Sequence, residues 1–192
     1  AEAVGLSASV ARGTRPAGLA ESAGRMSDWL ATEIGVRRPD FVDHSGLGDR
    51  SRLAPTDMVH ALVRLGPDLG LAQLLEDIPL RDADYRPVAD SAVEVRAKTG
   101  TLNFVSGLAG YVRPWGGREM AFAIFAADLP RRAAIPKAQR DRPEGAAPWA
   151  RRARVLQHRL IGRWAALHGD MPPEAFRLRP KRRPRGLACP EC

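Results

Sequence analysis

The sequence predicts an α+β domain in which helices pack on an antiparallel sheet. Helical periodicity occupies much of the first 76 residues and returns at 148–168, whereas three short apolar runs lie together between 92 and 127, separated by turn residues. Strands joined by short turns pair as an antiparallel meander, and helices before and after them cover the sheet. With 192 residues, the chain can form one domain with a hydrophobic core, or a large piece of one.

Helical patterns fill the first part of the chain, apart from one turn-rich loop. Residues 1–6 are typical of the middle of a helix, and because the first residue is not Met we expect a fragment or a processed chain. Residues 18–35 predict a helix that ends at Gly35, and residues 55–65 and 69–76 predict two more, with a loop at 41–54. The expected buried positions are Leu19, Ala23, Met26, Leu30 and Ile34 in the first of these helices, and Met58, Val59, Leu62 and Val63 in the second.

Three apolar runs predict the sheet. Residues 92–97 alternate as a strand does and lead directly into Lys98-Thr99-Gly100, and the runs 104–112 and 119–127 follow. Residues 129–147 are rich in Pro, Arg and Ala without periodicity, so we expect an inserted surface loop. Residues 148–168 predict a final helix that completes the domain 1–168, and residues 169–192 predict a disordered basic tail. The expected apolar stripe of the final helix is Trp149, Ala153, Leu156, Leu160 and Trp164.

Charge and ligand-forming residues exclude several classes of function. The net charge is +8, but residues 1–130 hold 14 basic and 17 acidic side chains, against 16 and 5 in residues 131–192. We therefore expect no nucleic-acid binding, and at most a weak polyanion contact through the basic tail. One cysteine pair, Cys189 and Cys192, supplies two of the four ligands of a structural zinc site, and the histidines lack partners at ligand spacing. We expect no metal and no cofactor, and no run of 18 apolar residues predicts a membrane span.

The strongest local signal is Lys98-Thr99-Gly100-Thr101 at the end of the first predicted strand. Only three of the 30 basic residues are lysines, so a lysine within a motif stands out. An edge strand can hydrogen-bond an extended peptide through its backbone. The ammonium of Lys98 and the hydroxyls of Thr99 and Thr101 can bind a carboxylate, and Gly100 lets a ligand approach the backbone closely.

Two stretches resemble one peptidase family. Lys-Thr-Gly on a strand is a motif of penicillin-binding proteins and serine β-lactamases. The longer stretch 96–112 resembles the S13 peptidases, which are low-molecular-mass class C penicillin-binding proteins, and Asp43-His44-Ser45-Gly46-Leu47 is similar to that family's Asp-Gly-Ser-Gly-Leu loop. The opening Ala-Glu-Ala is similar to the family's segment after Asn-x-x-Ala-Glu. The resemblance covers about residues 1–128 and implies the β-lactamase/transpeptidase-like fold, in part.

The resemblance also implies roles for individual residues. Ser45 would match the serine of the family's Ser-x-Asn motif, with Leu47 where that motif has Asn, and would relay a proton. Lys98 would add positive charge to the same proton network. Thr99 and Thr101 would bind the terminal carboxylate of a D-Ala-D-Ala stem peptide, and the Thr101 N–H would form half of an oxyanion hole. Ordinary structural roles for these residues remain open: a loop hydroxyl, a solvated lysine and β-branched strand formers.

One family motif has no counterpart here. Ser-x-x-Lys provides the acylated serine, and the residues three places before Lys98, Lys137 and Lys181 are Val95, Ala134 and Leu178. We expect truncation, so that the full protein is a periplasmic serine D-Ala-D-Ala carboxypeptidase or endopeptidase, inhibited by β-lactams, and this chain alone is inactive.

Several alternatives remain open. The chain could belong to a serine β-lactamase-like hydrolase, to a non-catalytic cell-wall-binding module, or to a polyanion-binding protein. A triad of Asp43, His44 and Ser45 is disfavoured, because sequence neighbours rarely point at one another.

Overall fold

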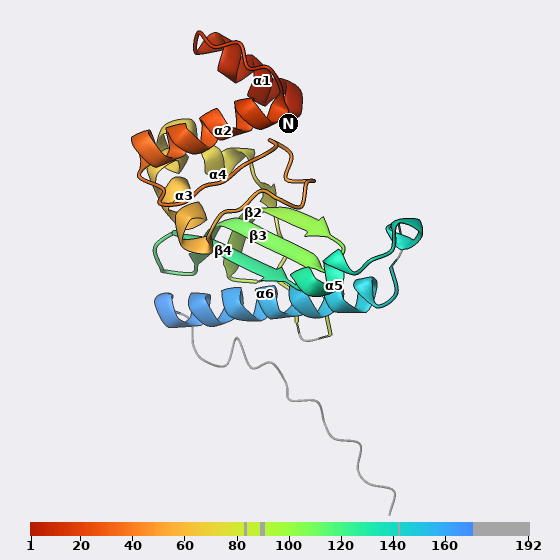
Figure 1. The fold of residues 1–192 in the computed structure, drawn as a ribbon. Helices are drawn as coiled ribbons and strands as arrows, with labels where there is room; N and C mark the ends of the chain where they lie inside the picture. The colour runs from red at the N-terminus through yellow and green to blue at the C-terminus, as the bar shows by residue number, and fades with distance from the viewer. Residues whose placement is uncertain (83, 89–90, 142, 171–192) are drawn as a thin grey trace, which may run out of the picture.

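The computed structural model describes residues 1–82, 84–88, 91–141 and 143–170, and places one sheet between two groups of helices (Figure 1). The helices are α1 (Glu2–Ala11), α2 (Leu19–Trp29), α3 (Pro55–Leu69), α4 (Leu71–Leu74), α5 (Leu129–Ala133) and α6 (Ala146–His168), with a π-helix η1 (Leu30–Ile34) and a 3-10 turn η2 (Lys137–Gln139). Helix α6 covers one face of the sheet, and α1 to α4 lie over the other. The arrangement is the α+β class predicted from the sequence.

The sheet has the order β1-β2-β3-β4, and every pairing is antiparallel. Strands β2 (Val93–Leu102), β3 (Val105–Pro114) and β4 (Met120–Ala127) are the predicted meander, and β2 continues through Lys98-Thr99-Gly100. The two-residue strand β1 (Glu76–Asp77) was not predicted: it lies where the third helix was expected to end, and it pairs with Ala97 and Arg96. A strand this short has no periodicity to detect, because only its pairing defines it.

The main core lies between the sheet and α6. It contains alternate residues of β2, such as Val93, Val95 and Ala97, together with Ile161 and Ala165 of α6. The predicted apolar stripe of α6 was wrong in part, because Leu156 is 50% exposed. The buried residues of the helix include Ile161 but are mostly small or polar: Ala150, Ala153, Gln157, His158, Ile161, Gly162 and Ala165. Small residues let α6 approach the sheet closely. A search for large apolar residues at helical spacing does not detect such buried positions.

Helix α3 packs on the opposite face of the sheet. The Tyr111 hydroxyl of β3 donates to the Leu62 carbonyl at 2.9 Å, and a Cβ atom at Gly66 would collide with that hydroxyl. Gly66 is therefore required by the close approach of the tyrosine. Residue Leu62 is buried as predicted, whereas Val63 is 56% exposed.

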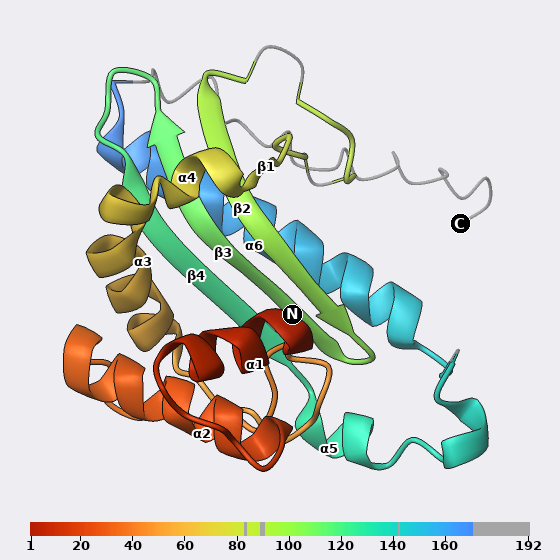
Figure 2. The ribbon, with the colours of Figure 1, turned by 90° about the horizontal axis from the view of Figure 1, so that it is seen from above.

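The N-terminal helices lie over α3 and one end of the sheet (Figure 2). The predicted helix 18–35 is divided into α2 and η1, and Gly35 ends it in the left-handed conformation with φ 77°. Ala23 is fully buried, but Leu19 is 41% exposed because it lies at the first position of the helix. The helix predicted for 55–65 extends to Leu69 and ends at Gly70, which is also left-handed.

The segment 129–147 differs from the expected irregular loop, because it contains α5, η2 and the start of α6. Asp128 caps α5 by accepting a hydrogen bond from the Arg131 N–H at 3.2 Å. Of the predicted tail 169–192, only Gly169 and Asp170 are described, and the Asp170 N–H donates to the Trp115 carbonyl. Cys189 and Cys192 lie outside the described residues. Within the part that the structure describes, no helix is both long and apolar enough to cross a membrane.

Candidate substrate-binding site

The end of β2 is an open sheet edge. Strand β1 pairs with β2 only as far as Ala97, so residues 98–102 have no strand beside them on that side among the described residues. The Ile78 N–H donates to the Val95 carbonyl at 2.8 Å, which shows that Val95 directs its backbone groups away from β3. Because backbone direction alternates along a strand, Thr99 and Thr101 present N–H and C=O groups to the same outer edge. These groups can hydrogen-bond an extended ligand.

The side chains of the motif flank this edge from both faces of the sheet. Val93, Val95 and Ala97 are buried against α6, so the two-residue period of the strand assigns Thr99 and Thr101 to the α6 face. Lys98 and Gly100 belong to the opposite face, over which α1 to α4 lie. All four residues are exposed. The predicted ligand-binding residues therefore lie on both faces of the sheet, around one edge, and not on a single face.

Lys98 has a partner that the sequence did not reveal. Its Nζ atom lies 3.5 Å from Oε1 of Glu76 in β1, and both side chains are about two-thirds exposed, at 67% and 69%. This exposed ion pair leaves the ammonium accessible to solvent, so a ligand carboxylate could compete with Glu76 for it. Glu76 could not be assigned to the site from the sequence, because β1 has no pattern of its own.

Ser45 lies in the loop 41–54, which Figures 1 and 2 both place beside the end of β2. The N–H groups of His44 and Ser45 donate to the Glu2 carboxylate of α1, at 3.1 Å each. The pKa of Glu2 lies below its ordinary value, chiefly because the Ser45 side chain hydrogen-bonds this carboxylate, with further contributions from the two backbone groups. The Leu47 N–H also donates to the Ser45 hydroxyl, at 3.3 Å.

No hydrogen bond joins Ser45 and Lys98 among the described residues. Their segments are neighbours, and on the side of the sheet that carries α1 and α2 the loop faces the Lys98 side of β2. The structure thus brings the lysine and threonines together on one strand and places the serine loop next to them, tied to α1.

Asp43 organises the same loop. Its carboxylate accepts hydrogen bonds from the N–H groups of Gly46 and Gly48, at 3.1 and 2.7 Å, and from the Ser51 hydroxyl at 2.9 Å. Although burial raises the pKa of Asp43, these bonds outweigh it and hold the pKa below its ordinary value. The carboxylate is engaged in turn formation and not with His44, which confirms that Asp43, His44 and Ser45 do not form a triad.

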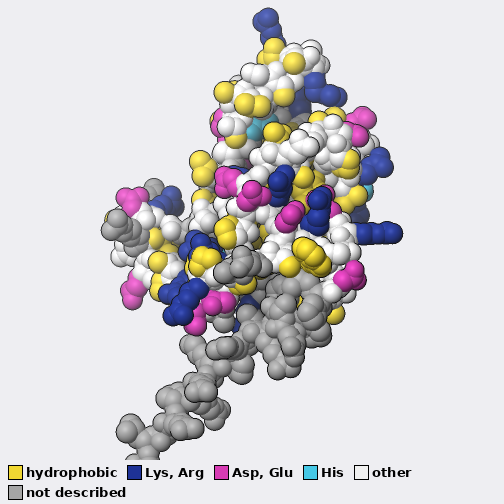
Figure 3. All heavy atoms as spheres, turned by 180° about the vertical axis from the view of Figure 1, so that it is seen from behind, with side chains coloured by type: hydrophobic (Ala, Val, Ile, Leu, Met, Phe, Trp, Pro, Cys, Tyr) yellow, Lys and Arg dark blue, Asp and Glu magenta, His cyan; other side chains and the backbone are white. Residues whose placement is uncertain are grey.

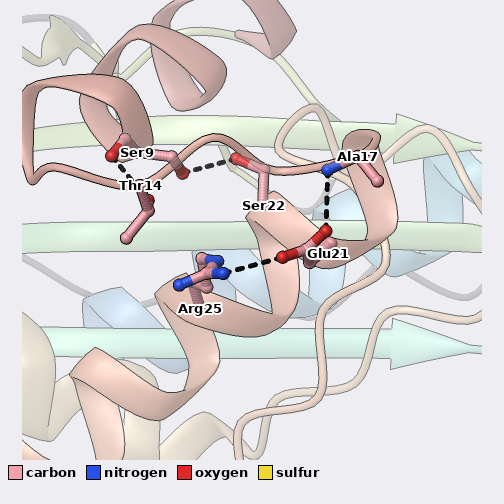
Figure 4. Close-up of polar contacts among 6 residues, drawn as sticks. All are labelled: Ser9, Thr14, Ala17, Glu21, Ser22 and Arg25. Atoms are coloured by element: carbon pink, nitrogen blue, oxygen red, sulfur yellow. Dashed lines mark hydrogen bonds and ion pairs between the residues drawn. The ribbon is translucent and has the colours of Figure 1, made fainter.

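His44 instead joins the loop to the N-terminal helices. Its Nε2 atom lies 2.9 Å from the Ser22 hydroxyl of α2, which in turn lies 2.7 Å from the Ser9 hydroxyl of α1. Figure 4 shows the Ser9–Ser22 contact where the two helices meet. A Cβ atom at Gly5 would collide with the His44 ring, so the ring lies directly against α1. Buried hydroxyls on two helices hold this loop, and no sequence spacing indicated that pairing.

A hollow beside this network is lined by α1, α2, η1 and His44. Arg12 and Trp29 both line it, with the Arg12 guanidinium 6.0 Å from the centre of the Trp29 ring. Arg25 lines the hollow and pairs with Glu21, which also accepts from the Ala17 N–H, each at 2.7 Å (Figure 4). This ion pair, with the hydrogen bond to the residue before Gly18, is an ordinary means of stabilising a helix start.

Within residues 1–82, 84–88, 91–141 and 143–170, no group of three or more His, Cys, Asp or Glu side chains is placed to hold a metal ion. On the face shown in Figure 3, acidic and basic side chains are interspersed and do not form one continuous basic area.

The fold of this chain is that of a known class of protein. The fold is similar to the crystal structure of penicillin binding protein 4 (dacB) from Haemophilus influenzae, complexed with a novel β-lactam, with a TM-score of 0.59 and 22% sequence identity. The likeness covers 84% of this chain and 38% of that chain. The α+β domain therefore has a transpeptidase-like fold, and the chain spans well under half the length of that relative.

The family follows from the sequence itself. Residues 1–151 match the D-Ala-D-Ala carboxypeptidase 3 (S13) family, and the chain belongs to this family. No curated protein matches the chain.

Proposed function

We propose that this chain forms the substrate-binding part of a serine D-Ala-D-Ala carboxypeptidase or endopeptidase that acts on peptidoglycan stem peptides in the periplasm. The observation that supports this most is the open edge of β2 at residues 98–102, bordered by Lys98 and by the exposed Thr99 and Thr101. An extended peptide can pair with that edge, with its terminal carboxylate at the ammonium and the threonine hydroxyls.

The chemistry assigned to the site follows from the direction of the backbone groups. The outward N–H of Thr101 is positioned to donate to a carbonyl oxygen of a peptide on the edge, as half of an oxyanion hole does. Lys98 supplies positive charge on the side of the sheet where the serine loop lies. Ser45 is the proposed proton relay, supported by the position of its loop beside β2, and its bond to Glu2 would have to rearrange for that role.

The acylated serine is not among these 192 residues, because the chain contains no Ser-x-x-Lys. The chain should therefore bind a peptide ending in D-Ala-D-Ala without reacting, and should form no covalent adduct with a labelled penicillin, a β-lactam that would inhibit the complete enzyme. Titration with an acetylated D-Ala-D-Ala peptide should shift the backbone amide signals of residues 98–101. The peptide with L-Ala-L-Ala serves as the control. Stoichiometric penicillin labelling would refute the assignment of the nucleophile, and equal binding of both peptides would refute the site.

The same absence favours a second candidate, a cell-wall-binding module that keeps the substrate edge without catalysis. Both functions predict peptide binding by this chain. They differ in the longer natural protein: an enzyme forms a penicillin adduct and releases D-Ala, whereas a binding module does neither.

A further inference from the structure

Strand β4 forms the second edge of the sheet. It lies at the opposite end of the strand order from β1, and among the described residues no strand pairs with its outer side (Figure 2). Its pairing with β3 runs without a break from Met120 to Ala127, so β4 contains no bulge. This unpaired edge is longer than the one at residues 98–102.

The alternation of backbone direction identifies the groups that β4 leaves free. Val95 directs its N–H and C=O away from β3, so Arg96 directs its own toward Tyr111, its partner in β3. The alternation continues through β3, and the even-numbered residues of β4 therefore bond to β3. The Asp128 N–H, which donates to the Phe104 carbonyl at 2.8 Å just beyond the strand, agrees with this assignment. The outward groups of the β4 edge belong to the odd-numbered residues: Ala121, Ala123, Phe125 and Ala127.

The β4 edge lacks the usual protection against pairing with another strand. Strand β4 consists of Met, Ala, Phe and Ile only, without a charged residue or a proline. Exposed edges of natural sheets are commonly blocked by charges, prolines or bulges, because free N–H and C=O groups otherwise bind a further strand. The edge at residues 98–102 carries Lys98, whereas the outward residues of β4 are mostly alanines. The β4 edge is therefore suited to accept a strand.

The sequence of β4 is complementary to itself when two copies run antiparallel. Outward backbone groups must face each other, which allows Ala123 of one copy to lie opposite Phe125 of the other, with Ile124 opposite its own copy on the two-fold axis. In this register Phe122 lies opposite Ala126, so each phenylalanine meets an alanine. A slip of two residues would instead place Phe122 opposite Ile124. Large side chains then fill the space beside small ones on both faces, since Phe122 lies on the α6 face and Phe125 on the other.

We propose that two copies of this chain associate through the β4 edge and form one continuous antiparallel sheet. The dimer is closed, because each copy uses the same edge and no further copy can add there. The partner is a second copy of this chain, and the inference does not depend on peptide binding at β2. One pair of strands buries less surface than a standard interface, so we expect a dissociation constant in the micromolar range.

Sedimentation equilibrium of the 192-residue chain, at concentrations from about 1 μM to 1 mM, tests the proposal. The mass should rise from that of one chain to that of two. Hydrogen exchange at the four outward amides should slow as the concentration rises, whereas exchange at the Ile124 amide should change little, because that amide bonds to β3 in either state. A chain that stays monomeric, or a dimer in which the four outward amides exchange as fast as in the monomer, overturns the proposal.

Two variants test the edge directly. The N–H lost in Ala123→Pro points away from β3, so this variant keeps the bonds within the sheet and removes a bond to the partner. Phe125→Lys places a charge on the edge, as natural edges do. Each should weaken dimerisation by about tenfold or more, as measured by sedimentation.

Leu156→Lys is the matched control for Phe125→Lys, because it makes the same kind of change on α6, at a residue that is 50% exposed against 39% for Phe125. It should dimerise as the native chain does. Native dimerisation in both edge variants, or an equal loss in Leu156→Lys, contradicts the assignment to the β4 edge. Amide spectra of each variant show whether the fold is intact.

Discussion

Glu76 should compete with a bound peptide for Lys98. The two groups lie 3.5 Å apart and are both about two-thirds exposed, so their attraction in water is about 1 kcal/mol by Coulomb's law. Exposed ion pairs contribute about 0.2–1 kcal/mol when measured. Glu76→Gln removes both this attraction and the repulsion between Glu76 and an incoming carboxylate.

The expected result is tighter binding with little change in stability. The dissociation constant of acetyl-Gln-D-Ala-D-Ala should fall about two- to fivefold in Glu76→Gln, the equivalent of at most about 1 kcal/mol. The gain should disappear at 1 M salt, where the screening length is about 3 Å. The free energy of unfolding, measured with urea, should change by less than about 0.5 kcal/mol.

Asp77→Asn provides the control for this prediction, because it removes the same charge from the same strand. The native Asp77 side chain pairs with Arg96 and not with Lys98. It should leave peptide affinity near that of the native chain. Equal gains in the two variants would show a general charge effect, and no gain in Glu76→Gln would refute the role of Lys98 as the carboxylate receptor.

Two further predictions concern stability. Tyr111→Phe should lower the free energy of unfolding by about 1 kcal/mol, because its hydrogen bond to the Leu62 carbonyl is lost. Gly66→Ala should lower the same free energy by about 1–3 kcal/mol. The double variant should lose less than the sum of the two, as measured by urea titration. Burial, with Arg81 and Arg154 nearby, lowers the pKa of His158 from 6.5 to about 4. The free energy of unfolding should therefore fall as the pH drops from 6.5 to 4, because the unfolded state takes up a proton that the folded state does not. His158→Gln should flatten that slope, and an equal slope in both proteins would contradict the cause.

Patterns among neighbouring residues predicted the helices and strands whose formation depends on those neighbours alone. The alternation of residues 92–97 predicted β2, and Gly35 predicted the end of the second helix, since a glycine adopts the left-handed conformation without a Cβ penalty. The motif at Lys98–Thr101 was recognised by its own residues and by its position after a strand. The family membership that the resemblance implied was confirmed.

Partners far apart in the chain could not be predicted in this way. Gln157 of α6 is buried, and its amide donates to the Ser106 carbonyl of β3 at 3.0 Å, 51 residues away. The predicted apolar stripe of this helix did not include position 157. The ties of the serine loop to Glu2 and Ser22 are of the same kind. They depend on how the helices pack, which local propensity does not encode.

The sequence alone determined the order of the longer helices and strands and the chemical groups at the end of β2, because periodicity, glycine stops and a short motif are properties of neighbouring residues. Tertiary structure decided that this strand end is an open edge and that Glu76 lies beside its lysine. Those facts arise from pairings between distant segments, whose geometry exists only once the sheet has formed.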